Sequence, residues 1–224
     1  MAPQLRRNPL GAHRQRNVTN KTTGGLLASA EQTLATARAG FEDLTGPMPE
    51  RRLSGLRNLV VFGRAVTNVL QNLRSTEPGF DEWYAPLVRE MESDPLLRFV
   101  YKLRSEILKE GTVPTSVSAH IRHLDFPGDF AKFGPPPPNA RSFFIGDQNG
   151  GSGWEVALPD GRVDKYYAAL PGDVGQVSVH LVGAPTEHLG QQLSDGRLET
   201  VCAAYLSYLE RLLAQAKLRF GGGA

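Results

Sequence analysis

The sequence predicts an α+β protein, a mainly α-helical bundle of about five helices with a small antiparallel β-sheet inserted before the last helix. Two observations predict this class. Before Gly111 and after Ser194, apolar residues recur at steps of three and four, which is the period of an amphipathic helix. Between them, prolines are frequent and the apolar pattern changes to alternation, as in strands. We expect the helical parts to share one core, because each helix must bury one apolar face.

Three helices are expected before the most informative stretch of the chain, at residues 26–44, 50–75 and 81–92. The first ends at Gly46-Pro47-Met48-Pro49, a sequence that cannot continue a helix. Gly63 in the second either allows close approach of another helix or is simply tolerated. Pro86 is expected to shorten or kink the third helix.

The fourth helix is expected between Asp94 and Gly111. Asp94 is a good N-cap and Pro95 suits the first helical position, where a missing N–H costs nothing. One apolar face is formed by Leu96, Val100, Leu103 and Ile107. Arg104 falls on the border of this face, whereas the other cations, Arg98, Lys102 and Lys109, gather on the side expected to meet water.

This helix resembles the motif helix of the HEPN family, the α-helical domains of prokaryotic toxins, defence proteins and RNA-processing enzymes. The family motif has an arginine, a polar residue, a short spacer and a histidine near the end of a bundle helix. Here Ser105 follows Arg104, but Lys109 stands where the shortest spacing would place histidine. Lysine is charged near pH 7 and cannot take up a proton as neutral imidazole does. The resemblance therefore implies a HEPN-like protein that has lost catalysis.

The first functional hypothesis is a cytoplasmic binding or assembly module of a toxin or phage-defence type system. Its partner would be a protein or RNA, and HEPN resemblance implies a homodimer. The residues predicted to bind that partner are Arg98, Lys102, Arg104, Ser105 and Lys109. A second hypothesis is a metal-independent ribonuclease, in which Arg104 stabilises phosphate charge and a histidine of the insertion, His120 or His123, replaces the missing one. A third is a structural or interaction protein without a ligand site.

Four strands are expected in the insertion, at residues 142–146, 154–158, 163–170 and 176–182. The sequence Leu158-Pro159-Asp160-Gly161 is a strong turn and joins the middle two strands. A last helix is expected at residues 194–220. The predicted organisation is a basic tail at 1–25, a first helical part at 26–111, the insertion at 112–193, the last helix at 194–220 and a short tail at 221–224.

Three further patterns in the insertion are candidate sites. His120 and His123, with Asp125 and Asp129 nearby, can share a helix turn or loop, but divalent metals favour a third ligand and a supported second shell, so we expect neither a metal nor a cofactor. The loop Gly150-Gly151-Ser152-Gly153 either cradles a phosphate through backbone N–H groups or is a flexible hairpin loop. An aromatic and basic set either stacks nucleic-acid bases or alternates core rings with solvated cations: Trp154, Tyr166, Tyr167, Arg162 and Lys165.

The charge of the chain is unevenly distributed. The first 25 residues hold five basic residues and no acidic one, which leaves 20 basic against 23 acidic residues in the remainder, or −3. We expect this tail to be disordered, and its lack of an apolar run excludes a signal peptide or membrane span. Cys202 is the only cysteine, which excludes an intrachain disulfide and favours a buried thiol in a reducing cytoplasm.

Overall fold

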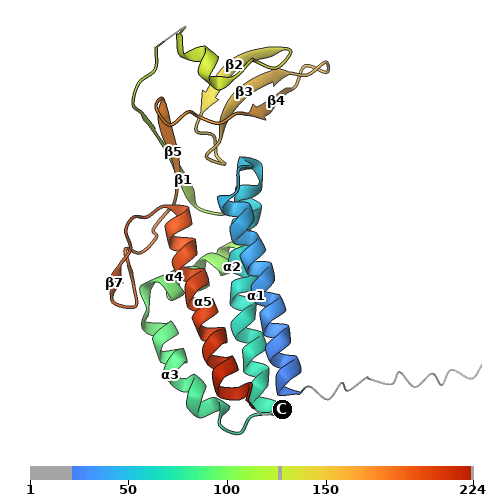
Figure 1. Ribbon diagram of the computed structural model, residues 1–224, viewed down its shortest axis with the longest axis vertical. Coiled ribbons are helices and arrows are strands. Elements are labelled where there is room, and N and C mark those ends of the chain that lie inside the picture. Colours follow the sequence, from blue (N-terminus) through green and yellow to red (C-terminus); the bar gives the residue numbers. More distant parts are fainter. Residues whose placement is uncertain (1–21, 126–127, 223–224) are drawn as a thin grey trace, which may run out of the picture.

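The computed structural model describes residues 22–125 and 128–222. Over these ranges it confirms the predicted α+β fold, with five α-helices and small antiparallel sheets. The helices are α1 (Thr23–Thr45), α2 (Pro49–Leu70), α3 (Phe80–Ser93), α4 (Pro95–Glu110) and α5 (Leu198–Phe220). Helices α1, α2 and α5 run beside one another along the long axis of the molecule (Figure 1). None of the helices in these ranges is long and apolar enough to cross a bilayer.

The strands form three separate small sheets instead of the single predicted sheet. They are β1 (Thr115–Ile121), β2 (Ala140–Ile145), β3 (Ser152–Ala157), β4 (Val163–Tyr167), β5 (Gly175–Leu181), β6 (Glu187–His188) and β7 (Gln191–Gln192). Strands β1 and β5 form a two-stranded ribbon, β2, β3 and β4 form a sheet, and β6 and β7 form a short hairpin. The ribbon leads from the bundle to the three-stranded sheet, which lies beyond one end of α1 and α2 (Figure 1).

Strand β1 was missed, because the sequence around His120 reads as a proline-flanked loop. It forms because β5 supplies a partner, with Val117 opposite Val179 and Thr115 opposite Leu181. Most residues of β1 are exposed, so its sequence lacks the clear alternation of apolar and polar residues that predicts a half-buried strand. The predicted hairpin across Leu158 to Gly161 is confirmed by the pairing of β3 with β4.

Several predicted boundaries were wrong by a few residues. Helix α1 begins at Thr23 instead of Leu26, because the Thr22 side chain caps it by accepting from the N–H of Gly25 at 3.1 Å. Helix α5 begins at Leu198 instead of Ser194, since Arg197 still pairs with His180 in an isolated β-bridge. The predicted second helix divides into α2 and a 3-10 turn, η1 (Gln71–Ser75). The rest of the basic tail, residues 1–21, lies outside the described residues.

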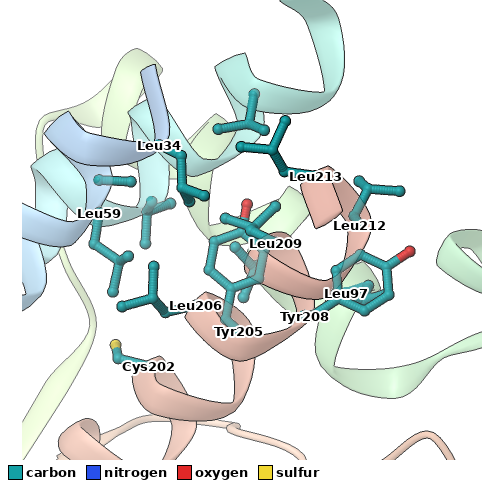
Figure 2. Close-up of a cluster of buried hydrophobic side chains, with 14 of the residues drawn as sticks. Leu34, Leu59, Leu97, Cys202, Tyr205, Leu206, Tyr208, Leu209, Leu212 and Leu213 are labelled. Atoms are coloured by element: carbon teal, nitrogen blue, oxygen red, sulfur yellow. The ribbon is translucent and has the colours of Figure 1, made fainter. Parts of the chain in front are cut away.

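Two apolar cores hold the chain together. The larger core joins all five helices and the bundle end of β5. Its α5 members, shown in Figure 2, include Leu209 and Leu212, and Leu34 of α1 and Leu59 of α2 lie in the same cluster. The smaller core, around Trp154, lies in the insertion together with a second 3-10 turn, η2 (Gly128–Phe133). The helices before and after the insertion therefore share one core, as the sequence predicted.

Helices α1 and α2 touch backbone to backbone through two glycines. A Cβ atom on Gly55 would lie 2.5 Å from the carbonyl oxygen of Gly40 and 2.6 Å from the backbone nitrogen of Leu44. At Gly63, a Cβ atom would lie 2.6 Å from the ring of Tyr205 on α5. Gly63 thus serves close packing, the first of the two alternatives that the sequence left open.

Gly55→Ala is expected to lower the free energy of unfolding by about 1–3 kcal/mol, because α1 and α2 must move apart to admit the methyl group. Thermal and urea unfolding of the full chain measure this loss. Gly24→Ala is the matched control, since no atom lies within 4 Å of the added Cβ, and it should be neutral or slightly stabilising in a helix. Equal stability of the two variants would contradict the close contact.

Candidate functional site

Helix α4 carries the residues predicted to form the binding site, and both of its ends are fixed as the sequence predicted. Asp94 is the N-cap and accepts a hydrogen bond from the N–H of Leu97 at 2.8 Å. Gly111 ends the helix in the left-handed conformation, with φ of 69°. Arg57 of α2 donates to the carbonyl of Gly111 at 2.8 Å, which ties this end of α4 to α2. The predicted apolar face of α4 is buried.

The five predicted binding residues fall into two groups on this helix. Arg98, Lys102 and Lys109 are exposed, and Lys102 makes a long ion pair of 3.8 Å with Glu106. Arg104 is half-buried, and its Nε atom is shielded from solvent without a hydrogen-bond partner in the described part of the chain. The hydroxyl of Ser105 donates to the carbonyl of Tyr101 at 3.1 Å, which is a helix contact and not a site contact. Four cations against Glu106 and Glu110 give α4 a charge of +2.

The structure does not bring His120 or His123 to Arg104. Gly111 lies seven residues after Arg104, about 10 Å along the helix axis, and β1 then carries the chain away from the bundle (Figure 1). His120 is the sixth residue of this strand and is exposed, about 17 Å beyond Thr115 at the rise of a strand. His123 follows the end of the strand.

The other two histidines within the described ranges have partners of their own. The Nε2 atom of His180 lies 3.3 Å from the hydroxyl of Ser118. The Nδ1 atom of His188 lies 3.1 Å from a carboxylate oxygen of Asp94. Asp94 is ten residues before Arg104, or about 15 Å along the helix axis. Arg104 therefore lacks a contact with any of these imidazoles that would make it part of an acid–base pair.

The predicted neighbours of His120 and His123 also have other roles. Asp129 accepts from the backbone N–H of Asp125 at 2.7 Å and makes an ion pair with Lys132 at 2.8 Å. The hydrogen bond from Asp125 and the contact with Lys132 lower the pKa of Asp129. Across residues 22–125 and 128–222, no three histidine, cysteine, aspartate or glutamate side chains are grouped to hold a metal ion.

The glycine loop does not offer its N–H groups to a phosphate. The N–H groups of Asn149 and Gly151 donate to one carboxylate oxygen of Asp147, each at 3.0 Å, and the N–H of Gly150 donates to the carbonyl of the same residue at 2.7 Å. A Cβ atom on Gly151 would meet the ring of Tyr167 and Pro49 of α2. The loop is thus a tight hairpin that packs against the end of the bundle, and the phosphate-cradle alternative is wrong.

The aromatic side chains of the sheet do not form a stacking platform. Trp154 is buried in the small core with 6% of its surface exposed, whereas Tyr166 is 58% exposed. Tyr167 donates to Asp147 at 2.7 Å, and Lys165 makes an ion pair with the same carboxylate at 2.9 Å. The predicted alternation of core rings with solvated cations is not observed either, because Trp154 is a core ring on β3 whereas β4 is mostly exposed.

A large cleft lies between α2, α3, α4 and α5, and the sequence did not reveal it. Its volume is about 1000 Å³. The side chains of Arg98 and Lys102 line it from α4, but Arg104, Ser105 and Lys109 do not. Its lining comes from residues that are far apart in the chain, from Arg64 on α2 to Tyr208 on α5. No single helix carries a pattern that distinguishes this lining from an ordinary core face.

Two tyrosine hydroxyls are buried in the cleft lining, and neither makes a hydrogen bond of ordinary geometry with the residues that the structure describes. They belong to Tyr84 of α3 and Tyr208 of α5, which are 4% and 3% exposed. Burial raises the pKa of both phenols. Gln71 and Thr67 lie close enough to Tyr84 to lower its pKa, and Glu90 lies close enough to Tyr208 to raise its pKa, although neither phenol makes a hydrogen bond of ordinary geometry. Figure 2 shows Tyr208 beside Leu97 of α4, at the edge of the apolar cluster.

The β6–β7 hairpin is fastened to α4 by Asp94, and the loop that leads into it lines the cleft. Besides the N-cap bond, Asp94 accepts from the N–H of Leu189 at 2.7 Å and contacts His188 at 3.1 Å. Pro185, which precedes β6, lines the cleft. Burial raises the pKa of Asp94, but the two backbone donors and His188 outweigh it, so the net pKa is below its usual value.

Asp94→Asn is expected to lower the free energy of unfolding at pH 7 by about 1–3 kcal/mol, because one of the three donors loses its acceptor. The pKa of Asp94 is lower in the folded state than in the unfolded state, so its carboxylate stabilises the fold above the unfolded-state pKa of about 4. This stabilisation disappears as the pH falls through the folded-state pKa. Urea unfolding from pH 7 to pH 3 measures the difference between wild type and variant.

Asp81→Asn is the control, because Asp81 is exposed and pairs with Arg74 at the surface. It should cost less than about 1 kcal/mol. A difference between wild type and Asp94→Asn that persists unchanged at pH 3 would contradict the role of the carboxylate.

Comparison with known proteins gives one family. Residues 48–125 match the model of the bacteriophage lambda protein ea47 family. The matched stretch runs from the start of α2 to just beyond β1 and includes α4 with Arg104, but it leaves out α1, α5 and most of the insertion. This part of the chain is therefore similar to a phage protein. Neither the curated proteins nor the solved structures gave a significant match.

Proposed function

We propose that the protein is a non-catalytic, HEPN-like binding module of a phage or defence-type system that holds RNA on the outer face of α4. The observation that carries the proposal is the state of Arg104. Its half-buried guanidinium, with an unpartnered Nε, lies at the border of the apolar face of α4, and Arg98, Lys102 and Lys109 are exposed elsewhere on the same helix. In the described part of the chain Arg104 makes no ion pair, and the accessible part of its guanidinium can donate charge-assisted hydrogen bonds to a phosphate.

The chemistry of this face supports binding rather than cleavage. RNA cleavage needs a group that exchanges protons near neutral pH next to the group that stabilises phosphate charge. His180 and His188 have other partners, and His120 and His123 lie away from Arg104. Lys109 lies five residues after Arg104, about 140° around the helix at 100° per residue. The match to a bacteriophage family over residues 48–125 is consistent with a phage-related role. A ribonuclease remains the alternative outcome of the test.

Binding is measured by fluorescence anisotropy with a labelled single-stranded RNA at several salt concentrations. Arg104→Ala is expected to weaken binding and to reduce the slope of log K against log salt by about one, since one phosphate contact is lost. Arg162→Ala is the control, because Arg162 is exposed in the β3–β4 turn and pairs with Asp160. It should leave the slope unchanged.

The same RNA, incubated with the protein and chelator, should stay intact. Cleavage that disappears in a folded Arg104→Ala variant would overturn the non-catalytic proposal. No measurable affinity for RNA in the wild type would overturn the RNA proposal and favour a protein partner. The predicted homodimer is tested separately by analytical ultracentrifugation of the wild type, where a monomer at micromolar concentration would contradict it.

A further inference from the structure

A groove at the junction of the insertion with the bundle lies apart from α4 and from the large cleft. Its volume is about 430 Å³. It is lined by Pro47 and Pro49 at the start of α2, by the loop that leads into β3, and by the segment between the end of β4 and the start of β5. We propose that this junction groove binds an extended segment of a partner protein, which adds a strand beside β5 and places an acidic group at Arg122.

Strand β5 has backbone groups that are free to pair with another strand. In an antiparallel pair, successive residues alternate between bonding the neighbouring strand and pointing away from it. The N–H of Arg122 donates to the carbonyl of Val174, directly before β5, at 2.8 Å, so the even-numbered residues of β5 are the ones that bond β1. The N–H and C=O groups of Val177, which lines the junction groove, therefore point away from β1.

The end of β4 supplies further free groups at the other wall of the groove. Ala168 donates its N–H to the carbonyl of Ser152 at 2.9 Å, so the backbone groups of Tyr167 point away from β3. Within the described ranges β4 pairs with β3 alone, and β5 pairs with β1 alone apart from one isolated bridge near its end. Because Tyr167 and Val177 both line the groove, a strand placed there meets hydrogen-bonding groups from both walls.

Small residues in the walls let another backbone approach closely. They are Gly150, Gly151, Ala168, Ala169, Gly172 and Gly175. Small side chains leave the strand backbones accessible, and glycine is common where another backbone comes close. Apart from its chain neighbours, no described atom lies within 4 Å of a Cβ atom built on Gly172, so the space beside this residue is open. The volume also falls within the range of about 300–1000 Å³ that is usual for ligand sites.

The polar groups of the lining favour a peptide over a compact polar molecule. The hydroxyl of Tyr167 is already bonded to Asp147, and the hydroxyl of Ser152 is shielded from solvent. Arg122, Gln176 and the main chain are then the polar groups that a ligand can reach. An extended peptide satisfies main-chain donors and acceptors at the regular spacing of a strand, as in other cases of strand addition to a sheet edge.

Arg122 sets the charge that the partner must carry. It is the only charged residue in the lining among the residues that the structure describes. It is exposed, and its Nη1 atom donates to the carbonyl of Gly172 at 2.9 Å, which holds the side chain beside the groove. The neighbouring carboxylate of Asp173 is paired with Lys132 at 2.7 Å and not with Arg122. The remaining N–H donors of the guanidinium are thus available to a carboxylate, which arginine binds through two parallel hydrogen bonds.

The experiment starts from a bead-bound library of random octapeptides, incubated with the fluorescently labelled full-length chain. Selected peptides should share one aspartate or glutamate at a fixed position. A synthetic copy of the consensus should bind with a dissociation constant on the order of 10–100 μM, as expected for a small interface. Methylation of its backbone nitrogens, one at a time, should weaken binding at least tenfold at the positions that face β5, which alternate along the peptide.

Two variants of the protein test the groove itself. Arg122→Gln should weaken binding of the consensus peptide about tenfold, because a charge-assisted hydrogen bond is lost. Its control is Arg141→Gln, on an exposed position of β2 outside the groove, which should change nothing. Gly172→Leu should abolish binding by filling the groove, whereas Gly24→Leu, at an equally open position of α1, should leave the affinity unchanged. The melting temperature of each variant is measured, and both leucine variants should fold because their Cβ atoms meet open space.

Several results would overturn the proposal: no enrichment of any peptide, backbone methylation that is tolerated at every position, or an affinity that Arg122→Gln or Gly172→Leu leaves unchanged. N-acetylaspartate that binds as tightly as the consensus peptide would also overturn it, and would make the groove a site for small carboxylates. Self-association of the wild type that Gly172→Leu abolishes would instead assign the groove to a second copy of the chain. Arg104→Ala should bind the consensus peptide as the wild type does, because no residue of α4 lines the groove. The peptide proposal and the RNA proposal can therefore fail independently.

Discussion

The carboxylate of Asp94 is the contact on which the basic helix α4 and the large cleft beside it depend. It begins α4, which carries the basic face, and it holds the β6–β7 hairpin beside the cleft. Its side chain is almost fully buried, so its charge must be met by hydrogen bonds. The N–H groups of two backbone residues and the imidazole of His188 bond this carboxylate. Without this carboxylate the start of α4 and the β6–β7 hairpin would no longer be fixed to each other.

Local signals in the sequence were enough to predict the helices. The N-cap at Asp94, the C-terminal Gly111 and the three-and-four spacing of α4 each describe one segment, and the structure agrees with all three. The prediction that the last helix joins the earlier ones in one core also follows from the need of each apolar face for a partner. Features that depend on a distant partner were harder to predict. Strand β1 exists because β5 pairs with it, and its own residues are mostly exposed.

The sequence did not predict the cleft, for a related reason. Tyr84 and Tyr208 read as ordinary members of amphipathic helices, and nothing near them in sequence shows that their hydroxyls lack partners. The close approach at Gly63, by contrast, was one of two alternatives that the sequence raised, and the ring of Tyr205 against it decides the question. A glycine in a helix carries a local signal, whereas an unsatisfied hydroxyl can be recognised only after the helices are placed.

The central claim is that Arg104 binds phosphate and does not take part in cleavage. The most direct measurement is the ¹H–¹⁵N resonance of the Arg104 side-chain Nε–H during titration with single-stranded RNA. The account predicts a shift of this resonance that saturates together with those of the α4 amides, while the RNA remains full length. A resonance that does not move while RNA binds, or RNA that is cut during the titration, would contradict it.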